Sequence, residues 1–156
     1  MTRRTQISVI GGGEGSDELL RKAEAVGRGI AEADAVLVCG GRGGVMEAAS
    51  RGAAEAGGTV VGVLPTSSPE EANPYVTYAI ATGIGHARNL AVAASGDAVI
   101  AVGGAWGTLA EMAFARALGR PVVALAGAPE VEGVEIAATP AEVVELALRL
   151  AGSPLA

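Results

Sequence analysis

The sequence is poor in the side chains that disulfides and metal sites require. Its 156 residues include one cysteine, Cys39, and one histidine, His86. A single cysteine cannot form an internal disulfide, and unpaired cysteines are typical of reducing compartments, so we expect a cytoplasmic protein. One histidine and one cysteine also cannot supply the usual ligands of a zinc site, so we expect no metal.

Long apolar runs and an excess of positive charge are also lacking. No stretch reaches the roughly 18 apolar residues that a membrane-spanning helix needs, so we expect no membrane partner. The formal net charge is −6, which is not the charge balance of a nucleic-acid-binding protein. The sequence has no internal repeat and no break in composition, so we expect a single domain over residues 1–156.

Short apolar runs that stop at or near glycine or proline recur along the chain. They are apolar throughout rather than alternating, as is typical of strands that are covered on both faces. We predict five such strands, over residues 6–10, 35–39, 59–65, 97–102 and 121–125, and a further short strand over residues 76–80 within an irregular segment.

Helical patterns separate these runs. Leu19, Ala23, Val26 and Ile30 recur at steps of four, three and four, which predicts one buried stripe on a helix over residues 17–32. Further helices are predicted over residues 45–56, 88–95, 108–118 and 140–150, and the third of these four is expected to bury Leu109, Met112, Ala113 and Ala117. Alternating strands and helices predict an α/β, Rossmann-like, three-layer fold with a mainly parallel sheet and helices on both faces.

Glycine clusters follow three of the predicted strands, at residues 11–15, 40–44 and 103–107. The carboxyl ends of parallel strands meet at one edge of a sheet, which is where ligands bind in this fold class. Glycine lets backbone N–H groups approach an anion, and the following helix adds a partial positive charge, so the clusters favour phosphate binding. None of them is a GxGxxG fingerprint or a Walker loop, and tight turns are the alternative interpretation.

The stretch "TLAE" at residues 108–111 supports two interpretations. Thr108 and Glu111 have the spacing of a capping box, in which the threonine caps a helix and the glutamate bonds back to it. The glycine cluster before them would also place Glu111 near a bound ligand, where a carboxylate could bind a sugar or activate water. Trp106, the only tryptophan, fits either the core or a cover over a ligand base.

Arg88 and His86 lie in a second stretch, "GHARN" at residues 85–89, at the start of a predicted helix. For Arg88 the alternatives are a solvated side chain and a ligand contact. For His86 a position at the loop surface is favoured over a catalytic role.

Several of these stretches together resemble the Lonely Guy (LOG) phosphoribohydrolases, also grouped under the heading "possible lysine decarboxylase", and their relatives the molybdenum-cofactor carrier proteins. The similar parts are "ISVIGGGEG", "VLVCGGRGGVMEAASRGAAEAGGTVVGVLP", "HARN" and "SGDAVIAVGGAWGTLAE". The resemblance implies a Rossmann-like, usually dimeric protein, with catalytic roles for Arg88 and Glu111. It implies ligand binding by the glycine loops and residues beside them, for which we predict Gly12, Gly13, Gly40, Gly41, Gly43, Gly44, Met46, Asn89, Gly103, Gly104, Ala105, Trp106, Gly107 and Thr108.

Three departures from the hydrolase pattern are more typical of the carrier-like branch. Residues 103–105 read Gly-Gly-Ala instead of Pro-Gly-Gly, the second glycine loop is one residue shorter, and Asn89 stands where the hydrolases usually carry lysine. Lysine decarboxylation is excluded on chemical grounds, because pyridoxal enzymes bind their cofactor through a lysine. The only lysine, Lys22, lies within a predicted helix and away from any strand end.

Three classes of function therefore remain open. The first is an enzyme that hydrolyses a nucleoside 5′-monophosphate to its base and ribose 5-phosphate. The second is a carrier or sensor of a phosphorylated ligand, such as a nucleotide or molybdopterin, and the third is an interaction protein whose loops bind nothing. No cofactor is expected to be required. The alanine-rich helices over residues 88–95 and 108–118 carry little charge, so we expect a homodimer or a higher homo-oligomer.

Overall fold

A seven-stranded sheet forms the centre of the protein in the computed structural model, which describes residues 2–152. Every pair of neighbouring strands is parallel, and the spatial order is β4-β3-β2-β1-β5-β6-β7. The strands are β1 (Gln6–Gly11), β2 (Val36–Cys39), β3 (Thr59–Leu64), β4 (Tyr78–Ala81), β5 (Ala98–Val102), β6 (Val122–Leu125) and β7 (Glu135–Ala137). The predicted parallel Rossmann-like fold is confirmed.

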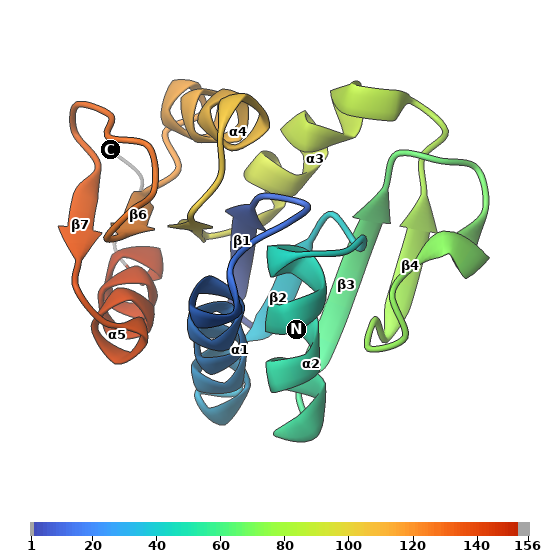
Figure 1. Ribbon diagram of the computed structural model, residues 1–156, viewed down its shortest axis with the longest axis horizontal. Coiled ribbons are helices and arrows are strands. Elements are labelled where there is room, and N and C mark those ends of the chain that lie inside the picture. Colours follow the sequence, from blue (N-terminus) through green and yellow to red (C-terminus); the bar gives the residue numbers. More distant parts are fainter. Residues whose placement is uncertain (1, 153–156) are drawn as a thin grey trace.

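Helices cover both faces of the sheet, as Figure 1 shows. On one face lie α1 (Asp17–Glu32), α2 (Val45–Glu55) and α5 (Pro140–Ala151); on the other lie α3 (Arg88–Ser95) and α4 (Trp106–Ala117). Two short 3₁₀ helices, η1 (Pro69–Glu71) and η2 (Gly85–Ala87), flank β4. Within residues 2–152, no helix combines the length and the apolar character needed to cross a bilayer.

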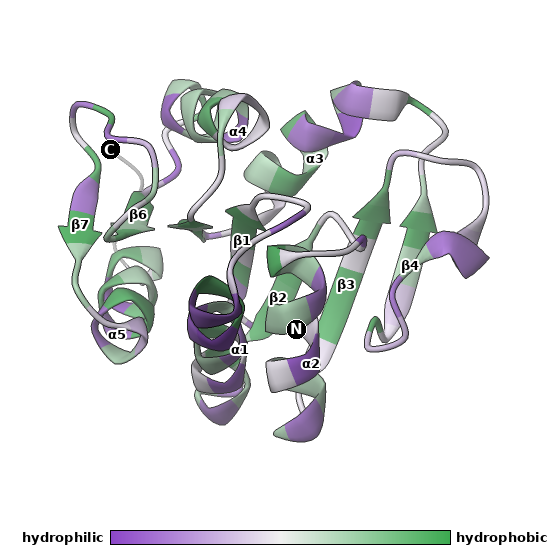
Figure 2. Cartoon of the chain, in the orientation of Figure 1, coloured by the Kyte–Doolittle hydropathy of each residue, from purple (hydrophilic) through white to green (hydrophobic). Residues whose placement is uncertain are grey.

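The central strands are buried on both faces, and they carry the hydrophobic colours of Figure 2. Ile7 and Val9 of β1 pack toward α1 and α2, whereas Ile10 packs toward α3 and α4. The predicted strands over residues 6–10, 35–39, 59–65, 97–102 and 121–125 all form, each to within two residues of its predicted ends. The edge strand β7 was not predicted.

The direction of strand addition reverses between β1 and β5. From β1 the chain builds outward through β2, β3 and β4, and it then returns to pair β5 with the other side of β1, so that Ile7 lies between Leu37 and Ala98. A crevice opens at such a reversal, outside the carboxyl ends of the strands, and ligands of this fold class bind there.

Helices α1 and α2 pack with unusually close backbones. A Cβ atom at Gly27 of α1 would overlap the Ala49 carbonyl of α2, and a Cβ atom at Gly52 of α2 would overlap the Glu24 carbonyl of α1. Both glycines are buried. Only glycine permits this approach at the two positions, which fixes each helix against the other.

Candidate functional site

The three glycine loops converge at the carboxyl edge of the sheet, because β2, β1 and β5 are neighbours. The loop after β1 lies in the middle. The Gly12 carbonyl accepts a hydrogen bond from the Val45 N–H at the start of α2, at 3.0 Å. A Cβ atom at Gly12 would lie 3.8 Å from the Gly104 Cα atom in the third loop. The structure therefore brings together loops that are separated by up to 90 residues in the sequence.

Two loop glycines are required by backbone geometry. Gly44 has a φ of 66°, and a Cβ atom there would overlap the Gly13 backbone of the first loop. Gly104 has a φ of 101°, and a Cβ atom there would overlap the Thr108 side chain. Both the positive φ values and the close contacts exclude larger residues, so glycine shapes the loops as well as exposing their amides.

The second loop is held through its carbonyl groups. The Gly40 carbonyl accepts from Arg88, while the Gly41 and Arg42 carbonyls accept from the backbone N–H and the Nδ2 of Asn73, at 2.8 and 3.0 Å. Because the carbonyl and N–H of a trans peptide point in opposite directions, these bonds turn the Arg42 and Gly43 amides the other way. Asn73, in the segment between β3 and β4, was not predicted as a site residue.

Arg88 is tied into the protein rather than solvated. Its Nη1 donates to the Gly40 carbonyl at 2.5 Å and to the Val63 carbonyl at 2.8 Å, and its Nε donates to Asn89 Oδ1 at 2.8 Å. The absence of a side chain at Gly40 makes room for the guanidinium. Burial lowers the Arg88 pKa from its ordinary value, and the negative charge of Glu111 acts in the opposite direction.

Glu111 is buried in α4, with 9% of its surface exposed. Burial raises the pKa of its carboxyl to about 7, and the positive charge of Arg88 lowers that pKa only in part. No described residue forms a hydrogen bond with the carboxyl. A group with this pKa is partly protonated and partly ionised at neutral pH, so it can give or take a proton.

The capping-box prediction for Thr108 and Glu111 is wrong. Helix α4 begins at Trp106, its N-cap is Ala105, and no side chain caps it. The first backbone bond of the helix runs from the Leu109 N–H to the Ala105 carbonyl at 2.9 Å. The N–H groups of the first turn, at Trp106, Gly107 and Thr108, therefore precede the hydrogen-bonded part of the helix and have no intrahelical partner.

A cavity of about 360 Å³ lies between these elements. This volume is within the range of small-molecule sites. The predicted catalytic residues Arg88 and Glu111 both line it, from α3 and α4. The complete lining is Gly11, Gly12, Gly13, Met46, His86, Arg88, Asn89, Ala105, Gly107, Thr108 and Glu111.

Some predicted ligand-binding residues do not line this cavity. Gly40, Gly41 and Gly103 are buried in the loops, whereas Gly43 and Gly44 are partly buried and Gly104 is exposed, and none of the six belongs to the lining. Trp106 is 83% exposed outside the lining, so it is not a core residue. Gly11 and His86 line the cavity but were not predicted as ligand-binding residues. For His86 the sequence favoured a position at the loop surface.

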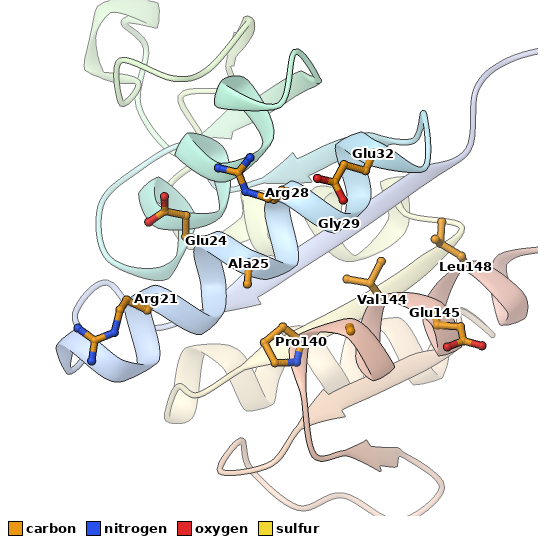
Figure 3. Close-up of a pocket in the computed structure, with 11 residues that line it drawn as sticks. Arg21, Glu24, Ala25, Arg28, Gly29, Glu32, Pro140, Val144, Glu145 and Leu148 are labelled. Carbon is orange, nitrogen blue, oxygen red and sulfur yellow. The ribbon is translucent and has the colours of Figure 1, made fainter.

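A second, larger groove of about 730 Å³ lies between α1 and α5, away from the glycine loops. Figure 3 shows small and apolar residues on its floor, such as Ala25, Gly29 and Val144, with Arg21 and Glu32 toward opposite ends. All the residues that line this groove belong to α1 and α5, so no glycine loop contributes to it. None of the glutamates in its lining is buried as Glu111 is. Among residues 2–152 there is also no group of three histidine, cysteine or acidic side chains placed to hold a metal.

Known proteins match the chain over most of its length. The solved structure of the molybdenum cofactor binding protein from the phototrophic bacterium Rippkaea orientalis is 36% identical, with a TM-score of 0.90, and the match covers 96% of this chain and 99% of that one. The molybdenum cofactor carrier protein from Chlamydomonas reinhardtii is 35% identical, with a TM-score of 0.85, over 97% of this chain and 100% of that one.

A phosphoribohydrolase matches a shorter region of the chain. The cytokinin riboside 5′-monophosphate phosphoribohydrolase of Rhodococcoides fascians is 42% identical over 93 residues, which are 57% of this chain and 47% of that protein. The resemblance to LOG and molybdenum-cofactor carrier proteins is thus confirmed. The profile of the SLOG cluster4 family matches residues 4–149, and the chain therefore belongs to the SLOG cluster4 family.

Proposed function

We propose that the protein binds a small phosphorylated molecule in the cavity below the glycine loops and acts as its carrier or sensor. The observation that carries this proposal is the uncapped start of α4 at the cavity. Ala105, Gly107 and Thr108 line the cavity, and the amides of the first turn lack intrahelical partners. The helix dipole adds positive potential there, which favours a phosphate group despite the negative net charge.

Molybdopterin and nucleoside monophosphates are the ligand classes that we propose, because each joins a phosphate monoester to a nitrogen heterocycle, which is a fused ring system in molybdopterin and in the purine nucleotides. The molecule is bound as cargo, and folding does not require it. The similarity to the molybdenum cofactor binding protein of Rippkaea orientalis and the molybdenum cofactor carrier protein of Chlamydomonas reinhardtii supports the carrier function, since both structures match nearly the whole chain. Amides at the α4 end would hold the phosphate, and the remainder of the cavity would hold the ring system.

Gly107 offers a clean test of phosphate binding. A Cβ atom there would meet no atom within 4 Å, so Gly107→Asp fits and adds a carboxylate at a residue that lines the cavity, beside the amides proposed to bind the phosphate. Gly107→Asn is the matched neutral control. Calorimetry with AMP, IMP and neopterin monophosphate should show binding to the wild type and to the asparagine variant, with at least about tenfold weaker binding to the aspartate variant. Equal binding by all three proteins, or no binding of any probe, would contradict the proposal.

Hydrolysis of a nucleoside 5′-monophosphate is a second candidate, favoured by the presence of Arg88 and Glu111 in the lining of one cavity. With a pKa of about 7, the ionised Glu111 carboxyl can accept a proton from water. The water oxygen would then bond to C1′ while the bond from C1′ to the base nitrogen breaks. The base nitrogen takes up a proton from solvent, and Glu111 returns the proton from water to solvent. The carboxylate also stabilises the positive charge that develops at C1′.

The hydrolase candidate is tested by incubating the protein with nucleoside 5′-monophosphates and measuring free base. Release by the wild type that is abolished in Glu111→Gln supports hydrolysis. Binding without release supports the carrier function alone. Release at equal rates by both proteins would exclude Glu111 as the group that accepts the proton.

We also propose that the protein self-associates through the outer face of α3 and α4. Leu90, Phe114 and Leu118 are 44%, 39% and 46% exposed, and Arg116 is the only charged residue on the exposed face of α4. Such a face is typical of an interface between copies. Light scattering should show a dimer or larger species that Phe114→Glu dissociates. Ile136→Glu, at an exposed apolar site on β7, is the control; a monomeric wild type would refute the interface.

A further inference from the structure

Asn89 has a fixed orientation at the edge of the cavity. Arg88 Nε donates to the Asn89 side-chain oxygen at 2.8 Å. A guanidinium has only donors, so the atom that faces it must be the amide oxygen. The amide nitrogen, Nδ2, is then left as a pair of N–H donors without a protein partner among residues 2–152. Asn89 is half-buried and lines the cavity, so these donors are available to a ligand.

The cavity is lined by two chemically different groups of residues. Ala105, Gly107 and Thr108 come from the start of α4, and Arg88 and Asn89 come from the start of α3. Figure 1 shows these two helices beside each other, and both pack on the same face of the sheet. With the phosphate bound by the α4 amides, a ring that fills the remainder of the cavity would meet the Asn89 donors, because Asn89 lines the same cavity.

We infer that Asn89 is a specificity-determining residue that donates a hydrogen bond to a ring carbonyl of the ligand. The inference rests on the proposed function and narrows its ligand class: a phosphate monoester of a fused heterocycle with a lactam carbonyl, as in a 6-oxopurine or a pterin. An amino group at the same ring position would face the Asn89 amide nitrogen, and because both groups are donors, both would stay without a hydrogen bond in a partly buried site.

IMP and AMP form a matched pair of probes that differ only at one edge of the purine: IMP has a carbonyl at position 6 and a hydrogen on N1, whereas AMP has an amino group at position 6 and no hydrogen on N1. By calorimetry, the wild type should bind IMP about tenfold more tightly than AMP. Asn89→Ala should remove this preference. Asn89→Asp retains an oxygen for Arg88 but presents a second acceptor to the ligand, so the preference should invert toward AMP. The readout is the ratio of the two affinities, because the added charge weakens both.

Neopterin monophosphate separates the two sources of the carbonyl. Tighter binding than IMP identifies a pterin ligand and weaker binding identifies a purine ligand; in both cases Asn89→Ala should reduce the affinity. Equal affinities of the wild type for IMP and AMP, or a preference that persists in Asn89→Ala, would overturn the role of Asn89 while phosphate binding stands. Failure of all three probes to bind would overturn the proposed function itself. Thermal unfolding verifies that both variants fold.

Discussion

Replacing Glu111 by glutamine should stabilise the folded protein, although it removes the negative partner of Arg88. Two effects oppose each other at this carboxyl. Burial disfavours its ionised form, and the positive charge of Arg88 favours that form. The net result is a pKa of about 7 in place of the ordinary 4.5, so burial is the larger effect. Glutamine has nearly the same shape and no charge, so it does not carry the free-energy cost of burying an ionised carboxyl.

The magnitude follows from the two pKa values. Each pH unit between them corresponds to about 1.4 kcal/mol, which gives about 3 kcal/mol for the full interval. The folded state binds this proton more tightly than the unfolded state does. Stability from this group is therefore complete below pH 4.5, falls as the pH rises toward 7, and stays low above it. The advantage of Glu111→Gln should grow from near zero at pH 4.5 to about 3 kcal/mol at pH 8.

Urea unfolding of both proteins between pH 4.5 and 8 measures this difference, and all other titrating groups cancel in the comparison. Glu130→Gln, in an exposed loop, controls for the loss of one negative charge. A wild type that is more stable than the glutamine variant at pH 8 would show that attraction to Arg88 exceeds the effect of burial. The reasoning would then be refuted.

Three further changes test the fold. Ser8→Ala removes a buried hydroxyl that donates to the Val92 carbonyl at 2.6 Å, and chemical denaturation should show a loss of about 1 kcal/mol. Gly27→Ala forces a methyl group into the backbone of α2, and should lower the free energy of unfolding by about 1–3 kcal/mol. The pKa of Asp97 is lowered mainly by its hydrogen bond to Arg3; Asp97→Asn should therefore reduce the melting temperature at neutral pH, with the difference shrinking as acid protonates the wild-type carboxyl.

The sheet was predictable because its central strands are apolar on both faces and stop at glycine or proline. Strand β7 escaped prediction because it offers no such run. It has three residues, and both Glu135 and Ile136 are exposed. Its position depends on pairing with β6, where Ile136 lies opposite Ala124, and a single-sequence pattern does not contain that pairing.

The buried face of helix α4 was predicted incorrectly, because its sequence is rich in alanine. The expected inward positions included Ala113 and Ala117, yet both are exposed, and the helix buries Thr108, Glu111 and Ala115 together with Met112. Alanine fits either face of a helix, so it carries little directional signal. A buried glutamate contradicts the polarity rule on which such patterns depend, and departures of this kind are expected at functional sites.

The contacts of the second glycine loop were also beyond the reach of sequence patterns. Asn73 lies more than 30 residues from Gly40, and it meets the Gly41 and Arg42 carbonyls only because β3 is placed beside β2. The resemblance identified Arg88 as a site residue, but its bond to the Val63 carbonyl likewise arises from the fold.

The interlocked glycines of α1 and α2 have a consequence for recognition. The first glycine loop leads into α1 and the second into α2, so a rigid joint between these helices holds both loops in one arrangement before any ligand arrives. Because the two loops are preorganised, binding does not carry the entropy cost of ordering two flexible segments. The wall at the start of α3 is held separately, through the bonds of Arg88 to the Gly40 and Val63 carbonyls, so a ligand meets loops and wall in positions set by the fold.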